Sequence, residues 1–200
     1  MKNFFLMLLT FLCCPIIALA TPAESLQLLL FKFESLQAHF AETMMIQGEK
    51  QESFGTVWIQ RPNQFRWQAT QPTEELYISD GKELWQYEKD LSQVTVMAVN
   101  SQLAMRSPML LLSGKVGDVA ELYTVQELGV EQFLLTPKTA DSLIQSIMLQ
   151  FDHGILSELD ITNTLSEQTA IHFTEVKINQ PILPSQFQFT PPASADVLKE

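Results

Sequence analysis

The chain has 200 residues, of which 46% are hydrophobic and 18% are charged, and its formal net charge is -11 at pH 7. An acidic chain without a cluster of lysine or arginine does not suit nucleic acid as a partner. It is equally unsuited to the anionic surface of a membrane, which attracts such clusters. The length is ample for one domain whose hydrophobic core is stable by itself.

The N-terminus has the pattern of a secretory signal peptide. Lys2 supplies a positive charge, residues 4–17 contain no charge, and Ala18-Leu19-Ala20 is a small-x-small cleavage pattern. The apolar run is shorter than the about 20 residues that span a membrane. We therefore expect residues 1–20 to be removed after export, which leaves residues 21–200 as one domain.

Both cysteines of the chain, Cys13 and Cys14, lie inside this N-terminal segment. A lipid attachment site requires an aliphatic residue three positions before the cysteine and small residues directly before it. Neither cysteine has that context, so cleavage after Ala20 is favoured over lipidation. The mature chain then has no cysteine and folds in an oxidising compartment without disulfides.

The first element of the mature chain is expected to be a helix over residues 23–36, after Pro22 and with Glu24 near its start. Its apolar residues recur at helical spacing: Leu26, Leu29, Leu30, Phe33 and Leu36. From Leu36 onward, Ala38 and Phe40 alternate with polar neighbours, which predicts a strand. A short loop is expected over residues 48–55.

Short strands dominate the rest of the chain. Alternation predicts one strand around Val57 and Ile59 and another through Phe65 and Trp67. Residues 76–79 and 84–87 flank Asp80-Gly81, which is a strong signal for a hairpin. The remaining strands are expected at residues 94–97, 122–125, 132–136, 146–151, 155–161, 170–178 and 186–189, with a second hairpin at 152–154.

One short apolar helix interrupts these strands. Pro108 stands at its first turn, and Met109, Leu110, Leu111 and Leu112 follow. Short strands with turns between them favour one antiparallel sheet that curls into a barrel or half-barrel. If helices at residues 23–36 and 108–113 cover the opening, the space beneath them is an apolar chamber with a lid.

The sequence contains none of the usual motifs of catalysis or metal binding. It has no G-x-S-x-G elbow and no glycine-rich phosphate loop. Paired carboxylates occur near turns, at Glu74-Glu75 and at Glu88 and Asp90, where they are usually solvated. The three histidines lack the spacing of metal ligands and are expected at the surface: His39, His153 and His172. We expect no enzyme, no metal and no cofactor, although catalytic residues can also converge only in space.

Residues 61–96 carry the most specific pattern. It consists of Arg61-Pro62-Asn63-Gln64-Phe65-Arg66-Trp67, then Gln71-Pro72, then the hairpin from Ser79 to Tyr87 and the strand that begins at Gln93-Val94. Further matches follow at residues 107–112, 133–138 and 187–192. In this order and spacing the chain resembles the LolA family of outer-membrane lipoprotein carriers over essentially the whole mature chain.

The resemblance implies a mainly β fold, an unclosed antiparallel β-barrel covered by short α-helices that form a lid over a hydrophobic cavity. It implies acylated lipoproteins as cargo, an inner-membrane ABC transporter complex as donor and an outer-membrane lipoprotein as acceptor. The protein would then be a monomeric periplasmic chaperone of a Gram-negative bacterium. The acceptor of the same pathway shares the fold but is itself a lipoprotein, and the missing lipobox separates this chain from it.

The resemblance also assigns a role to Arg61. In the family, the arginine of R-P-x-x-F bonds backbone carbonyls of the lid and holds the empty carrier closed. The matching lid segment is Leu110 to Ser113, together with the first helix. Arginine has five donors and keeps its charge, so in an apolar surrounding it needs acceptors such as the free carbonyls of a helix end. From the residues alone, a surface pair with a carboxylate is the alternative.

The expected wall of the acyl-chain cavity combines this strand with both helices. Phe65 and Trp67 point to the same side of their strand. The other expected cavity residues are Leu29, Phe33, Met109, Leu110, Leu111 and Leu112. Residues of these types also form ordinary cores.

Two functions of other classes fit the same fold. The first is a periplasmic binding module that senses lipids or lipoproteins, which would normally carry a second domain. The second is an enzyme that acts on lipid or cell wall, which would need convergent polar residues in the cavity.

Overall fold

The computed structural model describes residues 20–100, 103, 107–114, 118–139 and 142–200. Apart from Ala20, the expected signal peptide with both cysteines lies outside the described residues, so its cleavage stays a prediction. None of the described helices is long and apolar enough to cross a membrane.

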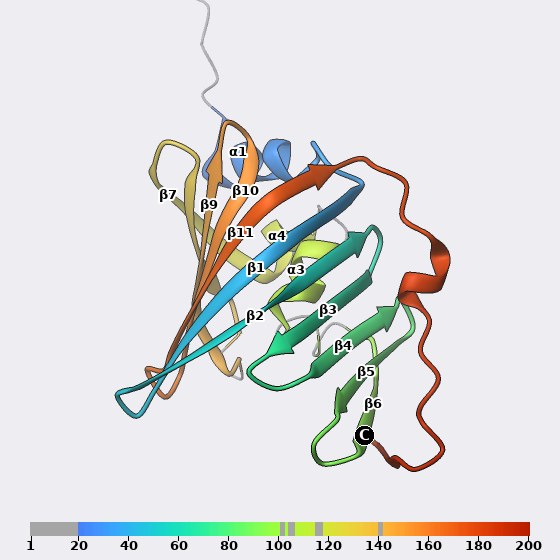
Figure 1. Cartoon of the computed structure of the whole chain (residues 1–200). Helices are drawn as coiled ribbons and strands as arrows, with labels where there is room; N and C mark the ends of the chain where they lie inside the picture. Colours follow the sequence, from blue (N-terminus) through green and yellow to red (C-terminus); the bar gives the residue numbers. More distant parts are fainter. Residues whose placement is uncertain (1–19, 101–102, 104–106, 115–117, 140–141) are drawn as a thin grey trace, which may run out of the picture.

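A single twelve-stranded sheet forms most of the molecule (Figure 1). Its strand order is β12-β6-β5-β4-β3-β2-β1-β11-β10-β9-β8-β7, and β7 and β12 are its two edges. All neighbouring pairs are antiparallel except β12 and β6, which run parallel. The expectation of a mainly β, unclosed barrel is therefore confirmed. The strands are β1 (Ser35–Ile46), β2 (Glu49–Gln60), β3 (Gln64–Gln71), β4 (Glu75–Asp80), β5 (Glu83–Glu88), β6 (Gln93–Ala98), β7 (Tyr123–Gly129), β8 (Gln132–Pro137), β9 (Ile144–Asp152), β10 (Ile155–Asn163), β11 (Gln168–Ile178) and β12 (Asp196–Lys199).

Within the described residues, three short α-helices with defined bounds accompany the sheet: α1 (Pro22–Leu30), α3 (Pro108–Ser113) and α4 (Asp118–Leu122). The expected helix at residues 108–113 is confirmed, whereas α4 was not expected. Helix α1 starts at a capping box, in which the Thr21 side chain and Glu24 bond each other's backbone N–H groups.

The prediction that the first helix reaches residue 36 is wrong, because α1 ends at Leu30. Asn179 fixes the chain beyond it: its side chain accepts from the Glu34 N–H at 2.8 Å and donates to the Lys32 carbonyl at 2.8 Å. Phe33 and Leu36 remain buried in the same core. Their spacing resembles that of a helix only because Phe33, in the loop after α1, and Leu36, at the start of β1, are buried in the same core as the apolar residues of α1.

The prediction of a loop at residues 48–55 is also wrong. Strand β2 begins at Glu49 and pairs with β1 along its whole length, and Gln47 and Gly48, both with positive φ, form the turn. The outer end of this hairpin is polar and exposed on both faces. It therefore lacks the apolar alternation by which strands are found in a sequence.

The C-terminal segment differs from expectation as well. Residues 186–189 are not a strand, because Pro184 starts a 3-10 helix, η1 (Pro184–Phe187). Phe187 is buried, and the Phe189 ring lies 5.8 Å from that of Tyr87. The segment then returns along the sheet and adds β12 to its edge (Figure 1).

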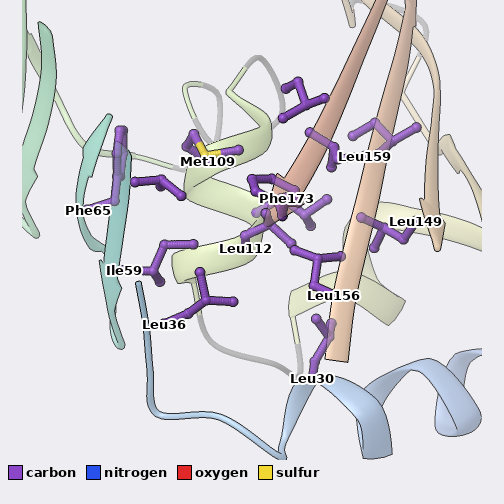
Figure 2. Packing of buried hydrophobic residues seen from close by; sticks show 14 of the residues in the cluster. Leu30, Leu36, Ile59, Phe65, Met109, Leu112, Leu149, Leu156, Leu159 and Phe173 are labelled. Atoms are coloured by element: carbon purple, nitrogen blue, oxygen red, sulfur yellow. The ribbon is translucent and has the colours of Figure 1, made fainter. Parts of the chain in front are cut away.

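The main hydrophobic core lies between the curled sheet and the helices. In Figure 2, Met109 and Leu112 of α3 lie between Phe65 and Ile59 on one side and Leu159 and Phe173 on the other. Strands from both halves of the sheet thus contact the same helix. Helix α3 is buried on all its faces, as expected for a helix made almost entirely of apolar residues.

Candidate functional site

A cavity of about 430 Å³ opens on the concave side of the sheet, next to the start of α3. Most of its wall is apolar and comes from β3, α3 and residues of strands β1, β4, β5, β6, β10 and β11. Its lining residues are Glu42, Met44, Phe65, Trp67, Glu75, Tyr77, Leu84, Met97, Leu103, Ser107, Pro108, Met109, Leu143, Ile161, Ile171 and Glu200.

Strand β3 supplies the aromatic part of this wall. Phe65 and Trp67 are buried while Gln64, Arg66 and Gln68 alternate with them, so the two rings face the concave side. The Trp67 ring stacks on Phe40 of β1, with centroids 3.5 Å apart and planes 18° apart. The wall is therefore a packed surface and not a set of free side chains.

Glycine is required opposite this stack. Gly55 pairs with Phe40 across β1 and β2, and a Cβ atom on it would lie 2.6 Å from the Phe40 ring. A Cβ atom there would also overlap the backbone carbonyl oxygen of Gln68 on β3, so no side chain fits unless both the strand and the ring move. Gly55 therefore allows β3 and the aromatic wall to approach β2.

Only part of the expected cavity residues line this cavity. Phe65, Trp67 and Met109 do so. The others belong to the buried cluster between the helices and the sheet: Leu29, Phe33, Leu110, Leu111 and Leu112. Movement of α3 or α1 away from the sheet would therefore expose further apolar surface next to the existing cavity.

Arg61 lies in the turn between β2 and β3, at the end of α3. Its Nη1 donates to the carbonyl of Gly114, the C-cap of α3, at 2.7 Å, and its guanidinium lies 4.5 Å from the centre of the Phe33 ring. The backbone N–H of Asn63 donates to the Ser113 carbonyl at 2.7 Å. Two hydrogen bonds thus join this turn to the last residues of the helix.

The guanidinium of Arg61 is poorly solvated. Burial lowers its pKa to about 10, which the nearby Glu34 carboxylate partly offsets. Its Nε and Nη2 atoms are buried and have no hydrogen-bond partner within the described residues. Arg61 therefore remains charged at neutral pH, and the buried, unpaired donors make the closed arrangement less stable than a fully paired one.

Three carboxylates and one tyrosine of the cavity were not expected from the sequence: Glu42, Glu75, Glu200 and Tyr77. Burial raises the pKa of Glu42, and burial, Glu88 and Glu42 raise the pKa of Glu75. Burial and the same acidic groups raise the pKa of Tyr77 to about 12. Glu75 is nevertheless exposed, as expected for a carboxylate near a turn, and alternation after Phe40 was the available signal for Glu42.

The histidines lie away from this cavity. The side chains of His39, His153 and His172 are 57%, 94% and 59% exposed, as expected for surface histidines. Across the described ranges, no group of three or more His, Cys, Asp or Glu side chains could hold a metal ion.

The sequence matches a known family along most of its length. The family model described as "Outer membrane lipoprotein carrier protein LolA" matches residues 32–190. The chain is 38% identical over 197 residues to the outer-membrane lipoprotein carrier protein of Pseudomonas syringae pv. tomato, covering 96% of this chain and 95% of the relative. It is 37% identical over 188 residues to that of Hahella chejuensis, covering 90% of each.

Solved structures share the fold at low sequence identity. An uncharacterized conserved protein from Thermus thermophilus superimposes with a TM-score of 0.52 at 13% identity, covering 88% of this chain and 99% of that chain. A chain of the Pseudomonas aeruginosa MucA/MucB complex gives 0.52 at 15% identity, covering 90% of this chain and 64% of that chain. These similarities support the fold alone.

Proposed function

Because the chain belongs to the LolA family of outer-membrane lipoprotein carrier proteins, we propose that it carries lipoproteins through the periplasm with their acyl chains in the concave cavity. It accepts this cargo from an ABC transporter complex of the inner membrane and delivers it to an acceptor at the outer membrane. It acts as a monomer. Members of this family are non-enzymatic transport chaperones, so the site works by binding and release and not by a chemical step.

The apolar cavity under α3 is the observation that carries this proposal. Each methylene group that leaves water for an apolar surrounding gains about 0.8 kcal/mol. An acylated protein therefore leaves a membrane only if another apolar surface receives its chains. The wall of Phe65, Trp67 and Met109 offers such a surface on one side of the sheet.

Cargo needs more room than the cavity of about 430 Å³ provides, if several long chains enter together. We propose that α3 moves away from the sheet when cargo binds. Leu110, Leu111 and Leu112, now packed in the core, then contact acyl chains, together with Leu29 of α1 and Phe33 after it. The empty carrier keeps these residues dry by packing them against each other.

Arg61 holds α3 in the closed position in this mechanism. A hydrogen bond with a charged partner contributes about 1.5–3 kcal/mol. Its bond to the Gly114 carbonyl favours the closed lid. Its two nitrogens without a partner among the described residues, Nε and Nη2, oppose the closed lid. The balance is small enough for cargo to reverse, because a ligand shifts a two-state equilibrium by its differential affinity.

Release of a lipoprotein from spheroplasts tests the carrier function. The full-length chain is expressed with its own N-terminal segment, purified without detergent and added to spheroplasts that contain a pulse-labelled lipoprotein. We expect the label in the supernatant as a one-to-one complex. No release under conditions in which an established carrier releases the lipoprotein would contradict the proposal and favour the sensing module.

Two arginine variants in the same assay separate the lid from the cavity. Arg61→Leu is expected to accept labelled lipoprotein but to pass less of it to outer-membrane acceptor. Arg66→Leu is the matched control, since Arg66 faces the opposite side of β3, where its Nε donates to Gln68. Equal onward transfer by wild type and Arg61→Leu would be consistent with the carrier function but would refute the role of Arg61 in holding the lid.

A further inference from the structure

The cavity is apolar along its wall but carries acidic groups. Glu42, Glu75 and Glu200 all contribute to its lining, and the described lining residues include no lysine, arginine or histidine. A ligand that inserts its chains between Phe65, Trp67 and Met109 therefore has its polar end close to carboxylates.

Three separate parts of the sheet bring these carboxylates to the cavity. Glu42 lies on β1 on the same face as Phe40, and its Oε2 accepts from Ser53 Oγ at 2.7 Å. Glu75 begins β4. Glu200 follows β12, and its backbone N–H donates to the Val96 carbonyl at 3.0 Å. The acidic character thus results from the tertiary structure and not from one acidic stretch of sequence.

Glu75 is repelled by the carboxylates of Glu42 and Glu88. Glu75 stands directly opposite Glu88 across β4 and β5, an arrangement of like charges that destabilises a sheet. Burial together with the charges of Glu88 and Glu42 raises the pKa of Glu75. In a cleft with apolar walls the charge of the half-buried Glu42 acts over a longer distance than in open water. A further anion would add to this repulsion, whereas a neutral or cationic group would not.

We propose that the acidic groups make the cavity a charge filter, which accepts acyl chains attached to an uncharged or cationic group and rejects chains attached to an anion. This inference rests on the proposed function, that the cavity takes acyl chains, and adds which chains it takes. Anionic phospholipids carry chains like those of lipoproteins and are present in membranes. A filter of this kind leaves them in place while the thioether-linked anchor of a lipoprotein, which has no phosphate, enters.

Three probes with one chain length and different charges test the filter. Decyl sulfonate and decyl trimethylammonium, both below their critical micelle concentrations, and decyl alcohol, below its aqueous solubility, are titrated at pH 8 into the purified chain. Trp67 fluorescence reports binding in a variant with the other two tryptophans replaced by phenylalanine. Two carboxylates at about 7 Å from the head group, in water-like surroundings, correspond to about tenfold weaker binding of the anion than of the alcohol. We expect the cation to bind at least as tightly as the alcohol.

A paired set of isosteric variants assigns the effect to the cavity. Glu42→Gln with Glu75→Gln is expected to raise the affinity for decyl sulfonate about tenfold and to leave that for decyl alcohol unchanged. Glu158→Gln with Glu175→Gln removes the same charge from the other face, where these carboxylates lie near His172 and His39, and is expected to change neither.

The outcomes separate this inference from the proposed function. Equal affinity of the wild type for all three probes would overturn the filter and leave the carrier intact. Failure of all three probes to bind would overturn the acyl-chain cavity and the filter together. An equal gain in sulfonate affinity in both variant pairs would assign discrimination to overall charge and overturn the role of the cavity carboxylates.

Discussion

Replacement of Arg61 by leucine is expected to tighten the binding of acyl chains while it changes the global stability little. In the closed state Arg61 donates to the Gly114 carbonyl at the end of α3. Closing of the lid competes with cargo for the same apolar surface. A variant without this bond therefore has a less stable closed state and a correspondingly higher apparent affinity.

The contacts of Arg61 set the size of the effect. The charged hydrogen bond is worth about 1.5–3 kcal/mol, and each ~1.4 kcal/mol is a factor of ten in an equilibrium constant. The buried Nε and Nη2, which lack partners within the described residues, reduce that value. Leucine keeps an apolar contact with the Phe33 ring, over which the guanidinium now lies. We therefore expect about tenfold tighter binding, at the lower end of the range.

Decyl alcohol titration and hydrogen exchange together measure this effect. The Kd of Arg61→Leu is compared with that of wild type, and exchange of the Gly114 N–H, which bonds the Leu110 carbonyl, reports opening of α3. Arg66→Leu is the control and should leave both values unchanged. Unchanged affinity with unchanged exchange at Gly114 would refute the lid argument. Slower exchange would show that the unpaired donors outweigh the hydrogen bond.

Further substitutions test the packing and the charges of the same site. Tyr123→Phe removes a buried hydroxyl that has no partner within the described residues, so it should stabilise the fold by about 1 kcal/mol in urea unfolding, and lower stability would contradict this. Gly55→Ala places a methyl group against the Gln68 carbonyl oxygen and the Phe40 ring and should cost about 3 kcal/mol in the same assay, whereas no change would show that both the strand backbone and the ring adjust freely. The raised pKa values of Glu42 and Glu75 mean that the folded chain binds more protons than the unfolded chain, so these groups reduce stability as pH rises above their ordinary value of 4.5. The double glutamine variant should therefore gain stability relative to wild type between pH 4.5 and 8, and parallel stability profiles would contradict the assignment.

The sequence identified most elements whose pattern is local. The alternation of Phe65 and Trp67 with polar neighbours marks β3, and Asp80-Gly81 marks the hairpin of β4 and β5. Pro108 followed by apolar residues marks α3. In each case one periodicity, or one turn residue, is enough to determine the element, because neighbours along the chain supply its hydrogen bonds or its buried face.

Local pattern failed where distant residues determine the backbone. The first helix ends at Leu30 because Asn179, 145 positions after Glu34, holds the following residues in another conformation. Strand β12 forms because the C-terminal segment returns to β6, to which it adds in parallel. Neither contact leaves a periodic pattern in the sequence.

Family membership could be recognised from the order and spacing of short motifs, because these motifs are distributed along most of the mature chain. The sequence by itself thus determined most of the strands, the apolar helix at residues 108–113 and the aromatic wall, which depend on residue periods of two or of about 3.6. Only the tertiary structure decided that Arg61 meets a carbonyl 53 positions away and that Glu42, Glu75 and Glu200 share one cavity. The reason is that curling of the sheet brings together side chains from strands far apart in sequence. A periodic pattern along the chain gives the face of each strand but not which distant strands come close in space.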